Sequence, residues 1–147
     1  MKIKVTLATE KDALFVMNFL LRNYIYLRKW PIGMLLSWIN WYCLAGFCTI
    51  SEREDNSVIV GLLMGRPMLN TDKVFVSPWD WSMDGDIFFI DTICTSHSGC
   101  IPFLAQKMIE SVGMKNKIAF TRDHGNMKTI HVWPTLKFVN KYASRKK

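Results

Sequence analysis

Hydrophobic and polar positions along the first 50 residues change from strand-like to helix-like spacing. Residues 2–7 alternate, which predicts a short strand with one hydrophobic face. Thr9 is a suitable N-cap for a helix over residues 10–26. Pro31 predicts a break and then a second helix to about residue 45, because proline is accepted in a first helical turn but not in a helix interior.

The next part of the chain is typical of strands. Two hydrophobic runs, residues 47–51 and 58–64, flank the charged segment 52–56, which predicts an antiparallel hairpin. Residues 74–76 are consistent with a further short strand, and residues 77–84 with a tryptophan-containing loop.

The second half of the chain predicts a β-α-β unit. Residues 86–94 are hydrophobic on both faces and indicate a central strand. From Ser98, hydrophobic side chains recur at three- and four-residue steps until Gly113, which predicts a helix, and residues 117–121 form another strand. The expected fold is therefore α+β: a mixed, largely antiparallel sheet with N-terminal helices and one C-terminal β-α-β unit.

Length and composition favour one domain over residues 1–147, since half of the residues are hydrophobic. No charge occurs in residues 30–50, but Pro31 and Gly46 interrupt that segment, so we expect a buried helix and strand rather than a transmembrane span. The N-terminus lacks a secretory signal, which favours a cytoplasmic location. The spacing of the four cysteines does not fit a metal site.

Positive charge is concentrated in the C-terminal part. Of the 19 Lys and Arg residues, nine lie in residues 115–147, where Asp123 is the single acidic residue. Such an end can dock an acidic carrier protein, an anionic lipid surface or nucleic acid, or it can be a solvated tail. No specific nucleic-acid motif is present. The many large hydrophobic side chains, among them six Trp and nine Phe, predict a protein partner or a homodimer.

The order of the expected elements resembles the GNAT acyltransferase superfamily. Within it, residues 26–32 (Tyr-Leu-Arg-Lys-Trp-Pro-Ile) resemble the His-Arg-x-Trp-Pro-Val segment of the toxin-activating lysine acyltransferases, which mature RTX cytolysins. Residues 80–82 (Asp-Trp-Ser), 85–86 (Gly-Asp) and 89–93 (Phe-Ile-Asp-Thr-Ile) resemble further motifs of that family in the same order. Residues 118–123 are similar to its later arginine-bearing strand, so the resemblance covers roughly residues 20–123.

The resemblance implies an activity on toxins. Members of that family are similar to GNAT enzymes that lost coenzyme A, and they move a fatty acyl group from acyl carrier protein to a lysine of a protoxin. Residues 95–100 contain Gly99 but no Lys or Arg for a pyrophosphate, as such a loss implies.

Related proteins encoded beside siderophore-carrying microcins help a second protein to attach the siderophore. We therefore expect a toxin-maturation acyltransferase that modifies a bacterial peptide or protein toxin. One form of this activity attaches a siderophore-type group to a microcin precursor together with a partner protein, and another is lysine acylation of an RTX protoxin. We expect no tightly bound cofactor, with acyl carrier protein or a siderophore conjugate as donor. The alternatives are a non-catalytic binding subunit of a maturation complex and a nucleic-acid-binding module.

Asp91 and His97 are the candidate catalytic residues. By resemblance, Asp91 matches the aspartate of the family's catalytic pair, whereas Leu27 occupies the place of its histidine and cannot accept a proton. His97, at the expected start of a helix, is the best substitute base, although it could also be a capping or exposed residue. A buried Asp91 needs a partner, either a histidine or Arg122 on the next strand, and a purely structural pair with Arg122 is an alternative.

The candidate substrate-binding residues are Trp30, Trp81 and Arg122. The aromatic side chains near residues 30–42 and 79–81 could form an acyl channel or a ring-stacking pocket. At helical spacing, Trp38 and Trp41 also fit ordinary core packing.

Overall fold

A computed structural model of the chain describes residues 2–71, 81–96, 98–124 and 127–144. The expected strand at 74–76, and part of the expected loop at 77–84, lie outside the described residues.

In the part of the chain that the structure describes, six strands form one sheet in the order in which they occur along the chain. Every neighbouring pair is antiparallel except β4 and β5, which run parallel on either side of α3. The fold class expected from the sequence is therefore confirmed, including the hairpin and the β-α-β unit. The strands are β1 (Ile3–Leu7), β2 (Cys48–Arg53), β3 (Ile59–Met68), β4 (Ile87–Thr95), β5 (Lys117–His124) and β6 (Met127–Pro134).

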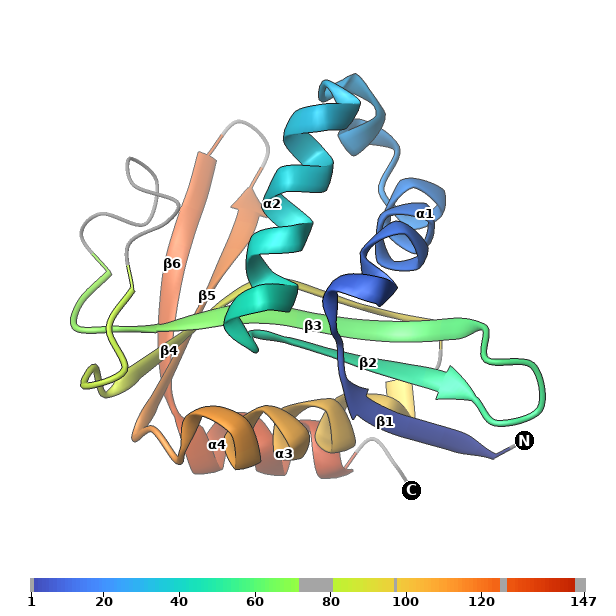
Figure 1. Cartoon of the computed structure of the whole chain (residues 1–147). Helices are drawn as coiled ribbons and strands as arrows, with labels where there is room; N and C mark the ends of the chain where they lie inside the picture. The colour runs from blue at the N-terminus through green and yellow to red at the C-terminus, as the bar shows by residue number, and fades with distance from the viewer. Residues whose placement is uncertain (1, 72–80, 97, 125–126, 145–147) are drawn as a thin grey trace.

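Two helices cover each face of the sheet (Figure 1): α1 (Ala13–Asn23) and α2 (Ile32–Ala45) lie on one side, and α3 (Ile101–Val112) and α4 (Thr135–Ser144) on the other. Short 3-10 turns precede α1, α2 and α3: η1 (Glu10–Asp12), η2 (Ile25–Lys29) and η3 (Ser98–Cys100).

The first helix is shorter than expected. Instead of continuing to residue 26, α1 ends where Tyr24 takes an extended conformation, with φ −125° and ψ 94°. The Tyr24 hydroxyl donates a hydrogen bond of 2.9 Å to the carbonyl oxygen of Ile93 in β4. This contact ties the end of α1 to the sheet. The second helix matches its expected range and ends at Gly46, whose φ of +78° is a left-handed conformation that glycine adopts without strain.

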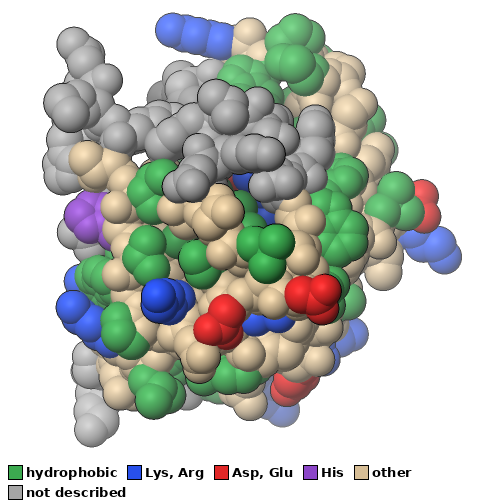
Figure 2. Space-filling view, turned by 90° about the vertical axis from the view of Figure 1, so that its left-hand side faces the viewer, with side chains coloured by type: hydrophobic (Ala, Val, Ile, Leu, Met, Phe, Trp, Pro, Cys, Tyr) green, Lys and Arg blue, Asp and Glu red, His purple; other side chains and the backbone are tan. Residues whose placement is uncertain are grey.

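The basic C-terminal part is structured over residues 127–144, so the alternative of a solvated tail does not apply to these residues. Residues 127–144 form β6 and α4, neither of which the sequence pattern predicted. Phe138 anchors α4, since its side chain is only 3 % exposed. The Nζ atoms of Lys137 and Lys141 lie 4.7 and 4.8 Å from the ring centroid of Trp133, close enough for cation–π attraction. On the face that Figure 2 shows, Lys and Arg side chains lie at several places around the surface, with acidic side chains among them.

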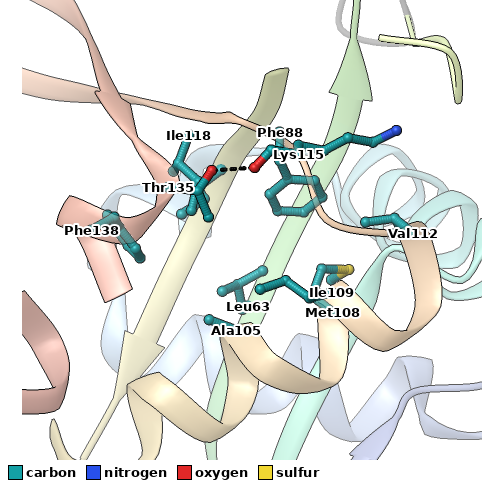
Figure 3. Close-up of a pocket in the computed structure, with 12 residues that line it drawn as sticks. Leu63, Phe88, Ala105, Met108, Ile109, Val112, Lys115, Ile118, Thr135 and Phe138 are labelled. Atoms are coloured by element: carbon teal, nitrogen blue, oxygen red, sulfur yellow. Dashed lines mark hydrogen bonds between the residues drawn. The ribbon is translucent and has the colours of Figure 1, made fainter. Parts of the chain in front are cut away.

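A small cavity lies between the sheet and the pair α3 and α4 (Figure 3). Its volume is about 20 Å³, and hydrophobic side chains such as Leu63, Phe88 and Met108 line it. The Thr135 hydroxyl at its edge donates a hydrogen bond to the carbonyl oxygen of Lys115, so this polar pair is already satisfied. Ligand pockets typically have volumes of about 300–1,000 Å³, so this space is a gap in core packing rather than an acyl-chain site.

The uncharged segment at residues 30–50 forms α2 and the first part of β2, as expected. Leu35, Ile39 and Tyr42 on α2 are at most 1 % exposed. Among the described residues, no helix combines the length and the hydrophobicity that crossing a bilayer requires.

Candidate functional site at the parting of β4 and β5

The sheet opens between β4 and β5 after a short parallel contact. Ile87–Ile90 pair with Lys117–Phe120, and beyond this point β4 continues beside β3 while β5 continues beside β6. Figure 1 shows the β5–β6 hairpin turning away from the first four strands. Asp91 is the first residue of β4 that no longer pairs with β5.

A β-bulge places Asp91 outside the regular register. On β4, Ile90 is opposite Gly65 and Thr92 is opposite Met64, so Asp91 between them has no residue opposite it on β3. A bulge of this kind redirects a side chain and often lies next to a functional site. The hydrogen bonds from Arg66 to Asp91 and to Tyr42 of α2 place the Asp91 side chain on the face covered by α2.

Gly65 allows the two strands to approach each other at the bulge. A Cβ atom added to Gly65 would lie 2.5 Å from the carbonyl oxygen of Phe89 and 2.6 Å from the ring of Phe88. Both distances are too short for any side chain, so only glycine fits here.

The variant Gly65→Ala is therefore expected to destabilise the fold by about 1–3 kcal/mol, because the strands must separate to relieve the overlap. Urea unfolding of both proteins measures the difference. The variant Gly33→Ala is the control, since nothing lies within 4 Å of a Cβ atom at that position. Equal losses in the two variants would contradict the tight approach at the bulge.

Arg66 is the partner of Asp91. Nη1 of Arg66 donates hydrogen bonds to Oδ2 of Asp91 and, at 2.9 Å, to the hydroxyl oxygen of Tyr42. The guanidinium carbon also lies 5.4 Å from the ring centroid of Phe89. The Arg66 side chain is 1 % exposed and that of Asp91 is 19 % exposed. The arginine is therefore part of the core, while the carboxylate retains access to solvent and to a ligand.

Two effects act on the charge of Asp91. Burial raises the pKa of its carboxyl group from the ordinary 3.8 to about 8, because the ionised form loses its hydration. The Arg66 guanidinium acts in the opposite direction, since a nearby positive charge favours the carboxylate. A carboxyl group whose pKa lies near neutrality can both accept and release a proton at physiological pH, which is the property required of a general base.

The stability of the fold should depend on pH through Asp91. Between pH 4 and pH 8 the folded protein retains a proton on Asp91 that the unfolded chain has released, because the pKa is about 8 in the fold and 3.8 ordinarily. Stability from this group is complete below pH 4 and is lost as the pH rises to 8. Urea midpoints at pH 5 and pH 8 should therefore fall more steeply for the native protein than for Asp91→Asn. Parallel declines would contradict the raised pKa.

Aromatic rings pack against the ring of Tyr42. Its ring meets Trp38 edge-on at 5.6 Å between centroids and Trp41 at 4.9 Å. The cluster extends to Trp30, which lies 5.6 Å from Trp38, and Trp81 joins it 5.5 Å from Phe47, which itself lies 5.8 Å from Trp41.

Both candidate substrate-binding tryptophans are partly open to solvent: Trp30 is 38 % and Trp81 is 45 % exposed. They are the two ends of a series of ring contacts. One inner ring of this series, Tyr42, accepts a hydrogen bond from Arg66 through its hydroxyl oxygen and so joins the series to the Arg66–Asp91 pair. The aromatic cluster is thus connected to the site, and its inner rings also pack the core.

Leu27 does not belong to the site. It is 4 % exposed and packs in the main hydrophobic core. We expect Leu27→His to destabilise the protein by about 1–3 kcal/mol, because the polar imidazole ring would be buried among hydrophobic side chains without a hydrogen-bond partner. Thermal unfolding measures this cost, and Leu27→Met is the control, since it keeps a hydrophobic side chain of similar volume. A histidine variant as stable as the native protein would contradict the buried environment.

The remaining candidates are placed only in part. His97 lies outside the described residues. Arg122 is in β5 opposite Thr129, and its side chain lies outside the described ones. The role expected of Arg122 or of a histidine as partner of Asp91 is filled by Arg66 in the described part of the chain. One signal could have found Arg66: it is the single charged residue in the long hydrophobic strand Ile59–Met68.

The arrangement of a six-stranded sheet that parts between β4 and β5, with two helices on each face, defines a GNAT-like α+β fold. Solved structures with this fold resemble the chain. The loading GNATL domain of CurA from Lyngbya majuscula superposes with a TM-score of 0.61 at 13% identity, over 86% of this chain and 71% of that one. A GNAT-family acetyltransferase from Listeria monocytogenes 4b F2365 gives 0.57 at 14% identity, over 98% and 84%.

Diaminobutyrate acetyltransferase EctA from Paenibacillus lautus, solved with L-2,4-diaminobutyric acid and coenzyme A, gives a TM-score of 0.54 at 16% identity. The alignment covers 82% of this chain and 66% of EctA. No protein-family model matches the sequence, and no curated protein matches it. At these identities the likeness concerns the fold.

Proposed function

We propose that the chain is an acyltransferase that modifies a bacterial peptide or protein toxin in the cytoplasm. The observation that carries this proposal is the position of Asp91. Its carboxyl group stands at the parting of β4 and β5, is fixed by a buried arginine and remains 19 % exposed. The β-bulge beside Asp91 supports this proposal, since bulges occur often next to active sites.

In the proposed reaction Asp91 is the general base. A nitrogen or oxygen atom of the acceptor forms a bond to the acyl carbon of the donor, and its proton passes to the Asp91 carboxylate. The bond between the acyl carbon and the leaving group of the donor then breaks. The leaving group takes up the proton from Asp91, which returns to its starting state. His97 stays a prediction for a second proton-transfer group.

The donor is proposed to be acyl carrier protein or a siderophore conjugate rather than coenzyme A. EctA was solved with coenzyme A. In this chain, residues 95–100 between β4 and α3 contain no Lys or Arg, so the segment offers no cationic side chain to a pyrophosphate. The nine basic residues at positions 115–147 would attract an acidic carrier protein by charge steering.

The acceptor is proposed from the sequence motifs. The segment Arg28-Lys29-Trp30-Pro31 and the run Phe89-Ile90-Asp91 favour a toxin as substrate, either a microcin precursor modified together with a partner protein or the lysine of an RTX protoxin. Exposed hydrophobic side chains on α1 and α2 support a partner or a homodimer, since such surfaces often bind proteins. They include Phe15 at 66 % exposed, Ile32 at 67 % and Leu44 at 64 %.

The test is to incubate the purified chain with a candidate precursor and a donor, and to measure the mass of the intact precursor. An added acyl or siderophore mass that disappears with Asp91→Asn supports the proposal. The matched control is Asp55→Asn, which removes a carboxylate from the exposed β2–β3 turn. Failure to modify any precursor, with and without a partner protein, would contradict it.

A second candidate is a non-catalytic binding subunit. The observation that favours it is the burial of Leu27 at the place of the family's histidine. In that case a partner protein would supply the reactive groups, and product would still form with Asp91→Asn. The same mass measurement, made with the partner present, distinguishes the two functions.

A further inference from the structure

The site contains a buried arginine and a buried tyrosine whose polar groups meet at one atom. Nη1 of Arg66 donates to both Tyr42 and Asp91, and the side chains of Arg66 and Tyr42 are at most 1 % exposed. Placing an arginine in a core is costly unless its charge and hydrogen-bond donors are matched. In the described part of the chain, this buried arginine contacts the candidate catalytic carboxylate.

The elements around Arg66 leave it little freedom. Pro67 follows it in β3, Phe89 of β4 lies 5.4 Å below the guanidinium, and the Tyr42 ring on α2 is itself held edge-on by two tryptophans. Because the Tyr42 ring is packed in this way, its hydroxyl oxygen has a fixed position. That oxygen accepts a hydrogen bond from Arg66, so the packing of α2 and β3 orients the guanidinium and, through it, the Asp91 carboxyl group.

We propose that Arg66 and Tyr42 are positioning residues that hold the Asp91 carboxyl group in the opening between β4 and β5 and keep its ionised form accessible near neutral pH. Arg66 thereby does what a histidine partner would do in orienting the aspartate, although it cannot itself accept a proton. This inference rests on the proposed function, in which Asp91 is the general base that Arg66 and Tyr42 position.

The charged and titratable groups that face Asp91 from its neighbours are few in the described part of the chain. The element α2 contributes the Tyr42 hydroxyl and β3 contributes the Arg66 guanidinium. On β5, Arg122 and Asp123 follow the last residue that pairs with β4, and their side chains are outside the described ones. Variants of Arg66 and Arg122 must therefore be compared.

The test needs no substrate. The chain is labelled with ¹³C at the aspartate carboxyl carbons, the Asp91 resonance is assigned from its loss in Asp91→Asn, and its titration is followed by NMR. We expect Arg66→Met to move the midpoint upward by about 1–3 pH units, the range typical of losing a neighbouring opposite charge. Arg66→Lys should restore part of the shift, and Tyr42→Phe should move the midpoint upward by less.

Thr49→Val is the control, since it removes a buried hydroxyl that donates 3.2 Å to the carbonyl of Leu104 under α3, away from Asp91. Its Asp91 midpoint should match that of the native protein. An unchanged midpoint in Arg66→Met, or a larger shift in Arg122→Met, overturns the proposal. If Arg66→Met does not fold, Tyr42→Phe decides: a native midpoint there overturns it. Because precursor modification is not measured, failure here is distinct from failure of the proposed acyl transfer.

Discussion

Replacing Asp91 by asparagine is expected to slow modification of the toxin precursor by about 10²–10⁴-fold, the usual contribution of a general base. Asparagine has nearly the same shape and can still accept a hydrogen bond from Arg66 through its amide oxygen, but it cannot take up the proton that the acceptor must lose. Single-turnover rates, measured from the mass of the precursor over time, give the ratio of native to variant.

The pH profile of the native rate provides an independent check. Because burial raises the pKa of Asp91 to about 8, the rate should rise with pH up to that value as the carboxylate form accumulates. The residual activity of Asp91→Asn should lack this rise. A variant that retains a native rate would leave the chain as a binding subunit whose partner carries out the transfer.

The sequence predicted the parts of the fold whose hydrophobic patterns are local. The strand with hydrophobic residues on both faces became the central β4, and the regular spacing after Ser98 became α3. The hairpin of β2 and β3 followed from two hydrophobic runs around a charged turn. In each case a few neighbouring residues are sufficient to specify the element.

Elements that depend on distant contacts were not predicted. The helix α4 is short and carries two lysines, and its place is set by Phe138, which packs in the main core, and by the hydrogen bond from Thr135 to Lys115, 20 residues earlier. The pairing of β6 with β5 is likewise a tertiary contact. The basic charge of this region left both a docking surface and a solvated tail open, because composition alone does not reveal such anchors.

The site was predicted in part for the same reason. Asp91 could be identified because a carboxylate in a hydrophobic strand needs an explanation. Its partner could not, because Arg66 and Asp91 are 25 residues apart and their meeting depends on the register of β3 and β4. The expected strand ended at residue 64, just before Gly65 and Arg66. The bulge beside Asp91 involves both strands and has no signature in either alone.

The buried pair should respond unequally to the loss of its two members. In Asp91→Ala the guanidinium of Arg66 stays in the core without the carboxyl group that accepts its hydrogen bond, and it cannot give up its proton, so we expect a loss of about 3–5 kcal/mol in the free energy of unfolding. In Arg66→Met the carboxyl group that remains can avoid a buried charge by staying protonated, since burial raises the pKa of Asp91 to about 8. The loss at pH 7 should therefore be smaller.

The double variant Arg66→Met with Asp91→Leu separates charge from packing. It removes both charges and fills the space with hydrophobic side chains, so it should recover most of the stability lost in Asp91→Ala, as replacement of buried ion pairs often does. Urea unfolding at pH 7 of the native protein and the three variants measures these differences. A double variant no more stable than Asp91→Ala would show that the pair stabilises the fold through its own attraction. Recovery would mean that the fold does not need the Arg66–Asp91 pair for its stability. The two side chains would then serve the chemistry of Asp91 rather than the free energy of unfolding.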